Sequence, residues 1–226
     1  MYNDYAKYFD KIFPASNSTV DFLDMHFIGT TVLDIGCGSG EYTNALFNKG
    51  YNVTGIDLDS EMITYAKQKN SAIPFHVENM LAMNDKKYDN LYCIGNTLVH
   101  LPTKEAIQLF LNKCFHKLND GSLILQIINY DRIIDQNITS LPTIENADIT
   151  FKRNYILSND KVTFSTILTT SKHTYHNSVD LIPLQKKELE EYLHIAGFKS
   201  ITCYDGFSNT LYHKNSYALV VEAKKL

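Results

Sequence analysis

The sequence predicts an α/β fold, in which a doubly wound, mostly parallel sheet of seven strands has helices on both faces and carries an antiparallel β insertion after the fifth strand. Two observations favour it. Over the first 129 residues, short apolar runs alternate with longer segments of helical character, the pattern of a parallel sheet covered on both faces. From residue 149 to 179 the chain changes to β-branched, partly alternating segments joined by turn-like sequence, the pattern of an antiparallel meander.

The first 129 residues are expected to form the parallel part of the sheet. Its five strands are predicted at residues 31–35, 51–57, 73–79, 88–96 and 121–129. The helices between them are predicted at residues 41–50, 60–70 and 103–118. Gly50 is expected to end the first helix and Ser60 to cap the second, because glycine favours helix C-termini and serine favours N-termini.

The last quarter of the chain is expected to complete the sheet. A helix is predicted at residues 184–197, ending at Gly197, and two final strands are predicted near 199–205 and 216–223. Residues 1–226 are expected to form a single domain, with the antiparallel insertion as a cap at about 140–180.

Aromatic residues follow a helical spacing at the N-terminus. They are Tyr2, Tyr5, Tyr8, Phe9 and Phe13. Such a stripe is typical of a helix that packs on a core, and it is also what an aromatic lid over a ligand would require. Both interpretations stay open at this point.

Composition excludes several classes of function. The chain has a formal net charge of −4 and a pI of about 6.0, and Arg132 and Arg153 are its two arginines, which argues against a dedicated nucleic-acid-binding protein. The N-terminus does not resemble a signal peptide, and no apolar run approaches the length of a membrane span. The four cysteines form no CxxC pair, so we predict no metal site and a cytoplasmic location with reduced thiols. The oligomeric state is not predicted.

Three glycines crowd between the first predicted strand and the helix that follows. Gly36, Gly38 and Gly40 leave bare backbone at a strand-to-helix turn, which is where such folds bind part of a nucleotide. A dinucleotide fingerprint would place its third glycine where Glu41 stands, and a carboxylate there would repel a pyrophosphate. Asp34, just upstream, likewise suits a ligand that carries positive charge.

A second acidic residue follows the second predicted strand. Asp57 stands where such a fold places the carboxylate that accepts the hydroxyl groups of a ribose. The expected ligand therefore has a ribose and a positively charged group and lacks phosphates. S-adenosylmethionine meets these conditions.

With these residues the chain resembles the class I S-adenosylmethionine-dependent methyltransferases, which have a Rossmann-like fold. DIGCGSG is similar to their first motif, GIDLDSEMI to their second and HVENMLAM to their third. The resemblance implies that S-adenosylmethionine is the cofactor, with Asp57 on its ribose, Leu58 and Met80 beside its adenine, and Asn79 in place of the aspartate that binds the adenine amino group. The expected cofactor-binding residues are Tyr8, Asp34, Gly36, Cys37, Gly38, Gly40, Asp57, Leu58, Asn79, Met80 and Cys93.

A narrower resemblance concerns the acceptor side. IGNTLVHLP, residues 94–102, is similar to the segment after the fourth strand of the glycine N-methyltransferases, and NYDRI, residues 129–133, to the end of their fifth strand. Those enzymes grip the substrate carboxylate with an arginine immediately before this Asn-Tyr-Asp, where Ile128 stands here. The resemblance therefore implies an acceptor other than glycine, neutral at this point or with its charge on Arg132 or Arg153.

Methyl transfer asks for orientation more than for acid–base chemistry, because the methyl carbon arrives already activated. Asn96, at the end of the fourth strand, is predicted to orient the nucleophile. Tyr130 is predicted to line the acceptor pocket, as is Tyr175, and His100 could act as a general base for a hydroxyl acceptor. The expected catalytic residues are Asn96, His100 and Tyr130.

These observations favour an S-adenosylmethionine-dependent methyltransferase that acts on a nitrogen or oxygen nucleophile of a small molecule. An RNA or protein methyltransferase, or a cofactor-binding regulatory protein without catalysis, remains as an alternative. A nicotinamide oxidoreductase is the weakest hypothesis, because the glycine spacing does not fit it.

Overall fold

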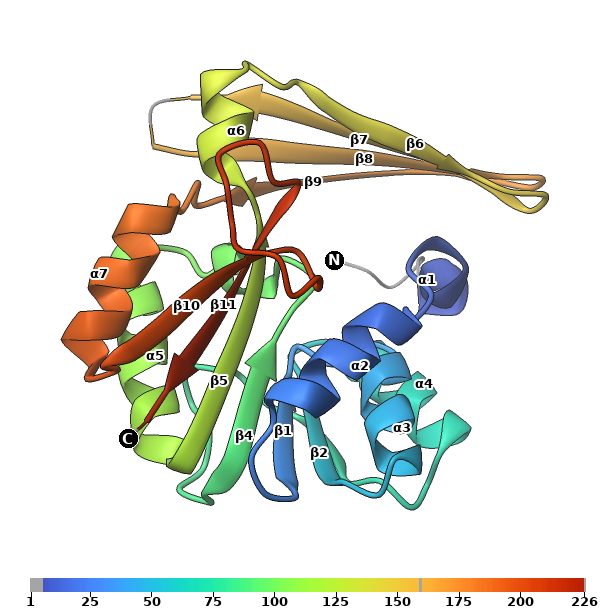
Figure 1. Cartoon of the computed structure of the whole chain (residues 1–226). Coiled ribbons are helices and arrows are strands. Elements are labelled where there is room, and N and C mark those ends of the chain that lie inside the picture. The colour runs from blue at the N-terminus through green and yellow to red at the C-terminus, as the bar shows by residue number, and fades with distance from the viewer. Residues whose placement is uncertain (1–5, 159, 226) are drawn as a thin grey trace.

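The computed structural model describes residues 6–158 and 160–225. It contains two sheets, a large mixed one and a smaller antiparallel one that lies above it as a cap (Figure 1). In the described part of the chain, no helix is both long and apolar enough to cross a membrane.

The large sheet has the predicted architecture. Its seven strands run in the order β10-β11-β5-β4-β1-β2-β3, and β11 is antiparallel to both of its neighbours while β1 to β5 are parallel. The strands are β1 (Thr31–Ile35), β2 (Asn52–Asp57), β3 (Phe75–Val77), β4 (Tyr88–Cys93), β5 (Leu118–Ile128), β10 (Ser200–Asp205) and β11 (Ala218–Lys224). The chain leaves β1 toward β2 on one side and returns to β4 on the other, so a crevice for a ligand is expected at the carboxyl ends of β1 and β4.

Helices cover both faces of this sheet, as predicted. Alternate residues of the central strands point to opposite faces, so that Val32 belongs to the core cluster that includes α2 and α3, whereas Leu33 belongs to the one that includes α5 and α7. The helices are α2 (Asn17–His26), α3 (Glu41–Asn48), α4 (Ser60–Lys69), α5 (Lys104–Lys117) and α7 (Lys186–Ala196). The helix α2 was not predicted, although it buries Phe22 and Leu23 against the sheet.

The smaller sheet is the antiparallel insertion, with the order β6-β7-β8-β9. Its strands are β6 (Ser140–Glu145), β7 (Ile149–Leu157), β8 (Val162–Thr170) and β9 (Thr174–Leu181). The strand β6 and the helix α6 (Tyr130–Asp135), which connects β5 to the cap, were not predicted. Residues 129–133 are therefore not the end of a strand, because the side chain of Asn129 accepts a hydrogen bond from the Arg132 amide and begins α6.

The predicted N-terminal cap of α4 is wrong by one residue. The cap of α4 is Asp59 and not Ser60, because the Asp59 carboxylate accepts hydrogen bonds from the amides of Glu61 and Met62.

The helix predicted from the aromatic spacing is described as α1 (Ala6–Ile12), while Tyr2 and Tyr5 lie outside the described residues. A 3₁₀ turn, η1 (Thr97–His100), follows β4.

Candidate functional site

The glycine loop joins β1 to α3 with three residues in the left-handed region. The φ angles are 78° at Gly36, 53° at Gly38 and 77° at Gly40. A Cβ at Gly36 would lie 2.5 Å from a side-chain carbon of Thr97, and one at Gly40 would lie 2.8 Å from the ring of Phe75. Glycine is therefore required here by the backbone conformation and by the chain's own packing, and these three positions place no side chain of their own over the loop.

Asp57 holds this loop against the end of β2. Its carboxylate accepts hydrogen bonds from the amide of Gly38, at 2.8 Å, and from the amide of Asp59, at 2.9 Å. Each oxygen keeps further lone-pair capacity, so the group can still accept bonds from a pair of hydroxyls. Burial raises its pKa above the ordinary value. The half-buried carboxylate thus lies beside the loop, where a ribose is expected.

The start of α3 is unsuited to a phosphate. Glu41 occupies its first turn and forms an ion pair of 2.7 Å with Lys69 of α4. The carboxylate therefore stands at the helix N-terminus, where the macrodipole would otherwise favour a bound anion. This geometry agrees with a nucleotide ligand that lacks a pyrophosphate.

Asp34 lies beneath the loop and not on its open side. Its side chain is 3% exposed, and its carboxylate accepts hydrogen bonds from the hydroxyls of Thr43, at 2.6 Å, and Tyr92, at 2.5 Å. Burial raises the pKa of Asp34 to about 7. The carboxylate thus joins β1, α3 and β4, and in this arrangement a bound cation would feel its charge through the loop without touching it.

The raised pKa of Asp34 predicts a pH-dependent stability. The folded protein binds this proton more tightly than the unfolded chain, so the resulting stabilisation is complete below about pH 4 and is lost as the pH rises to about 7. Asp34→Asn keeps an acceptor for both hydroxyls and cannot ionise. We expect the variant to melt at least about 3 °C above the parent at pH 8, roughly what 1 kcal/mol produces in a protein of this size, and by a smaller margin at pH 5, where only part of the stabilisation has been lost. Scanning calorimetry at both pH values checks this, and a variant that melts lower at pH 8 contradicts it.

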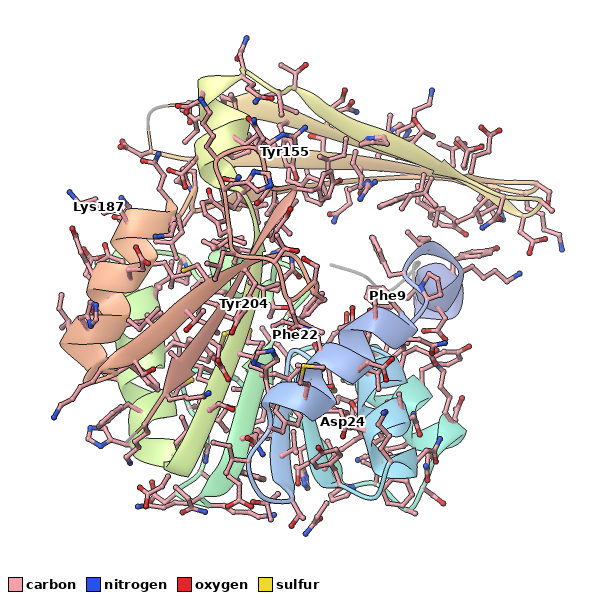
Figure 2. All side chains as sticks on the ribbon, in the orientation of Figure 1. Phe9, Phe22, Asp24, Tyr155, Lys187 and Tyr204 are labelled. Carbon is pink, nitrogen blue, oxygen red and sulfur yellow. The ribbon has the colours of Figure 1, made fainter. Side chains whose placement is uncertain are left out.

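The helix α1 covers the loop from above. Phe9 lies closest to it, since a Cβ at Gly38 would stand 3.3 Å from the Phe9 ring. Asp10 fixes the helix by bonding to the hydroxyl of Ser39 in the loop and to the ammonium of Lys69. Figure 2 shows Phe9 on α1, at the side of the molecule that carries α2 and α3. Tyr8, the predicted cofactor contact, packs instead with the cap residues around Ile12.

Removal of the Asp10 carboxylate tests whether α1 acts as a lid. Asp10→Ala should weaken S-adenosylmethionine binding about fivefold, because about 1 kcal/mol of charge-assisted bonding holds α1 over the loop. The melting temperature should fall by less than about 2 °C, since these contacts lie near the surface. Asp21→Ala, which removes a surface carboxylate paired with Lys49, is the matched control. Equal losses of affinity and stability in Asp10→Ala would favour simple packing.

The residues predicted beside the adenine lie on one open edge of the site. Leu58 is 71% exposed, which leaves an apolar side chain uncovered next to Asp57. The side-chain oxygen of Asn79 accepts a hydrogen bond of 2.8 Å from the Leu81 amide, so one lone pair of this oxygen remains for a ligand. Met80 is half-buried and packs against the main core. These placements leave room for a flat aromatic group over Leu58.

The two cysteines that were predicted to bind the cofactor lie in different surroundings. Cys37, in the glycine loop, packs beside Ile63 and Phe75, and burial raises its pKa well above the ordinary value. Cys93, at the end of β4, is completely buried in the main core. Both thiols are therefore neutral packing groups in this structure.

A partly buried polar pair lies at the carboxyl ends of β4 and β5. The side-chain amide of Asn96 donates to the hydroxyl of Tyr130 at 3.1 Å, and its oxygen accepts from the Ile128 amide at 3.0 Å. Burial raises the pKa of Tyr130, so its hydroxyl stays protonated. Ile128 stands where the glycine N-methyltransferases have their arginine. Here its backbone amide fixes the orientation of the Asn96 side-chain amide.

His100 ends the turn η1 immediately after this pair. Burial lowers its pKa, so the ring is neutral at pH 7 and can accept a proton. Within the described residues its ring makes no hydrogen bond or ring contact. Tyr175, the other predicted wall residue, packs at the far end of the cap near Ile12. Among the described residues, no cluster of histidine, cysteine and carboxylate side chains could hold a metal ion.

Sequence reasoning did not identify Asp10 or Tyr155 in this region, and it named Phe9 only as part of the aromatic stripe. Phe9 and Asp10 belong to the aromatic helix, but the spacing does not tell which side faces the loop. Tyr155, on β7, is 3% exposed and lies near Tyr130. The alternation of buried residues along β7 could have placed Tyr155 on the inner face of the cap.

Comparison with known proteins agrees with this geometry. A family model described as a methyltransferase domain matches residues 32–121, which run from β1 into β5. The chain is similar to a glycine/sarcosine N-methyltransferase of Aphanothece halophytica, with 26% identity over 202 residues, covering 86% of this chain and 75% of the relative.

Two solved structures have the same fold. One is a S-adenosylmethionine-dependent methyltransferase from Clostridium acetobutylicum, with a TM-score of 0.86 and 17% identity, covering 99% of this chain and 98% of that one. The other is an amino pentose methyltransferase from Micromonospora echinaspora with S-adenosylmethionine bound, with a TM-score of 0.68 and 16% identity, covering 99% of this chain and 89% of that one.

Proposed function

Because the chain belongs to the class I S-adenosylmethionine-dependent methyltransferases, we propose that it transfers the methyl group to a nitrogen or oxygen nucleophile of a small-molecule acceptor. The observation that carries this proposal is the Asn96–Tyr130 pair, a buried tyrosine and a partly buried amide at the strand tips below the cap sheet. A pair enclosed in this way suits a small acceptor better than a macromolecule, which would need an open and charged surface.

The cofactor, S-adenosylmethionine, supplies a methyl carbon that is already activated for displacement. The glycine loop would offer it bare backbone, and Asp57 would accept the ribose hydroxyls. The exposed side chain of Leu58 would pack on the adenine. Asp34 favours the cofactor's positive charge from beneath the loop, and Phe9 covers the site from above. These roles leave acid–base chemistry to the acceptor side.

On that side, the chain's contribution is orientation. Asn96 has both ends of its amide engaged, so its position is fixed. The Tyr130 hydroxyl accepts from Asn96 and keeps its own proton and a lone pair for the nucleophile. Holding the nucleophile in line in this way supplies most of the required rate enhancement. His100, neutral at pH 7, would take the proton from a hydroxyl acceptor.

The experiment that tests this proposal is a screen for release of S-adenosylhomocysteine with amines, amino acids, phenols and carboxylic acids. We expect turnover with at least one small acceptor, at about 1 s⁻¹ or faster for the natural one. Methylation of RNA or protein alone would replace this proposal. Tight cofactor binding with no turnover on any acceptor class would favour the regulatory alternative.

A further inference from the structure

The inner face of the cap carries a polar row inside an otherwise apolar surface. Arg153, Thr166 and Asn177 are register partners across β7, β8 and β9, and the apolar Leu141 of β6 ends the row. On β7, Arg153 alternates with two buried residues of the same face, Phe151 and Tyr155, while Lys152 and Asn154 are exposed on the other face. Arg153 therefore points to the side of the cap that faces α1 and the main sheet.

The guanidinium of Arg153 is only partly satisfied. Its Nη2 donates to the carbonyl of Pro142 at 2.7 Å, while its Nε is buried and has no hydrogen-bond partner among the residues that the structure describes. No described carboxylate pairs with this arginine. A buried cationic donor without a partner is costly, so its retention indicates an anion that completes it.

A second unsatisfied donor stands beside it. The hydroxyl of Tyr155 is buried without a hydrogen-bond partner in the described chain, and burial raises its pKa, so it remains a proton donor. Tyr155 and Arg153 are two residues apart on one face of a strand, roughly 7 Å between their Cα atoms. Tyr155 also lies near Tyr130, whose hydroxyl bonds to Asn96. Tyr155 and Tyr130 belong to the same core cluster, so the two free donors lie on the face of the cap that is turned toward the proposed acceptor site. Figure 2 shows Tyr155 within the cap.

We propose that Arg153 and Tyr155 form the anion subsite of the acceptor, which is a small amine or alcohol carrying a carboxylate or phosphate group close to its nucleophile. The inference rests on the proposed function and narrows its acceptor. A planar guanidinium with a free Nε–H and a neighbouring hydroxyl matches the oxygens of such a group. The subsite lies on the cap, whereas the glycine enzymes that the chain resembles place their arginine at the position of Ile128.

Arg132 does not compete for this role. Its guanidinium lies over the ring of Tyr217, 5.7 Å from the ring centre, so its charge already has a partner. It belongs to α6 and not to the cap sheet. The chain therefore offers one arginine with an open donor and one that is stacked.

Having two arginines makes a direct test possible. In a ¹⁵N-labelled sample loaded with S-adenosylhomocysteine, the two Nε–H resonances are assigned with Arg153→Lys and Arg132→Lys. Titration with acetate and with inorganic phosphate should shift the Arg153 resonance saturably and leave that of Arg132 unchanged. The anion that saturates at the lower concentration distinguishes a carboxylate from a phosphate acceptor. The absence of a saturable shift with either anion, or an equal shift with acetamide, overturns the proposal.

Turnover supplies the second readout. Each acid that is active in the acceptor screen is compared with its neutral amide, and the acid should be preferred at least tenfold in kcat/KM. Arg153→Lys, which keeps the charge and loses the fork of donors, should raise KM for the acid roughly tenfold with little change in kcat. Lys152→Gln is the matched control, because it removes a positive charge from the opposite face of the same strand. Equal use of acid and amide by the parent protein would also overturn the subsite.

The two proposals can fail separately. A saturable shift of the Arg153 resonance without turnover on any acceptor would leave the anion subsite standing and remove the methyltransferase activity. Turnover without a preference for the acid, and without a shift of the Arg153 resonance, would leave the methyltransferase activity standing and remove the anion subsite. Unchanged melting temperatures of the lysine variants establish that the fold is intact.

Discussion

Asp57→Ala is expected to weaken S-adenosylmethionine binding by about 1.5–3 kcal/mol, or roughly 10- to 150-fold in Kd, the usual scale for hydrogen bonds to a charged group. The carboxylate accepts hydrogen bonds from the amides of Gly38 and Asp59, so its loss loosens the loop and would also remove the proposed ribose contact. Isothermal titration calorimetry at pH 7.5 measures the effect. An unchanged Kd would remove Asp57 from the site.

Two further variants separate the charge from the fold in this prediction. Asp57→Asn keeps an acceptor for one loop amide and should lose less affinity than Asp57→Ala. Asp59→Asn, two residues away, keeps the cap of α4 through its amide oxygen and should bind the cofactor as the parent does. A loss in Asp59→Asn as large as that in Asp57→Ala would mean that local charge, and not the ribose contact, accounts for the affinity.

Gly36→Ala is expected to lower the free energy of unfolding by roughly 2–4 kcal/mol and to abolish measurable cofactor binding. One part of the cost is the left-handed conformation, φ 78°, at about 1–2 kcal/mol. The other is overpacking, because the new Cβ would lie 2.5 Å from a carbon and 2.9 Å from the oxygen of the Thr97 side chain. Guanidinium denaturation measures the stability and calorimetry the binding.

The chain provides a matched control for the cost of overpacking against Thr97. Gly50 also has a positive φ, 98°, but a Cβ there would have nothing within 4 Å, so Gly50→Ala should show the conformational cost alone. Combining Gly36→Ala with Thr97→Ala should recover most of the difference between the two glycine variants, as a double-mutant cycle measures. If both glycine variants cost the same, Thr97 does not restrict the loop.

The sequence predicted the elements that have strong periodicity. The strand at residues 31–35 is observed with the same ends as β1, and the change from helical to alternating pattern located the cap strands β7 to β9. The turn after this strand was also predicted, because three closely spaced glycines are typical of a backbone with positive φ angles. These features depend on neighbours in the chain and are therefore visible in sequence.

The features that were missed depend on distant contacts. The short helix α6 begins because the Asn129 side chain caps it, and the run of apolar residues before it read as a continuing strand. Asp34 was expected to face the ligand, but only the packing of Tyr92 and Thr43 around it shows that it is buried. Likewise, the free Nε of Arg153 depends on the register of the cap, which the spacing of residues along one strand does not give.

The helix α1 has a consequence for the order of events at the site. Two consecutive residues near its end contact different parts of the molecule: Asp10 is bonded to the glycine loop, and Lys11 forms an ion pair of 2.5 Å with Asp148 of the cap, beside Ile12 buried among cap residues. A ligand that docks α1 on either side pre-orders it for the other. Donor and acceptor affinities are then thermodynamically reciprocal, so S-adenosylhomocysteine should tighten acceptor binding by the same factor by which the acceptor tightens S-adenosylhomocysteine.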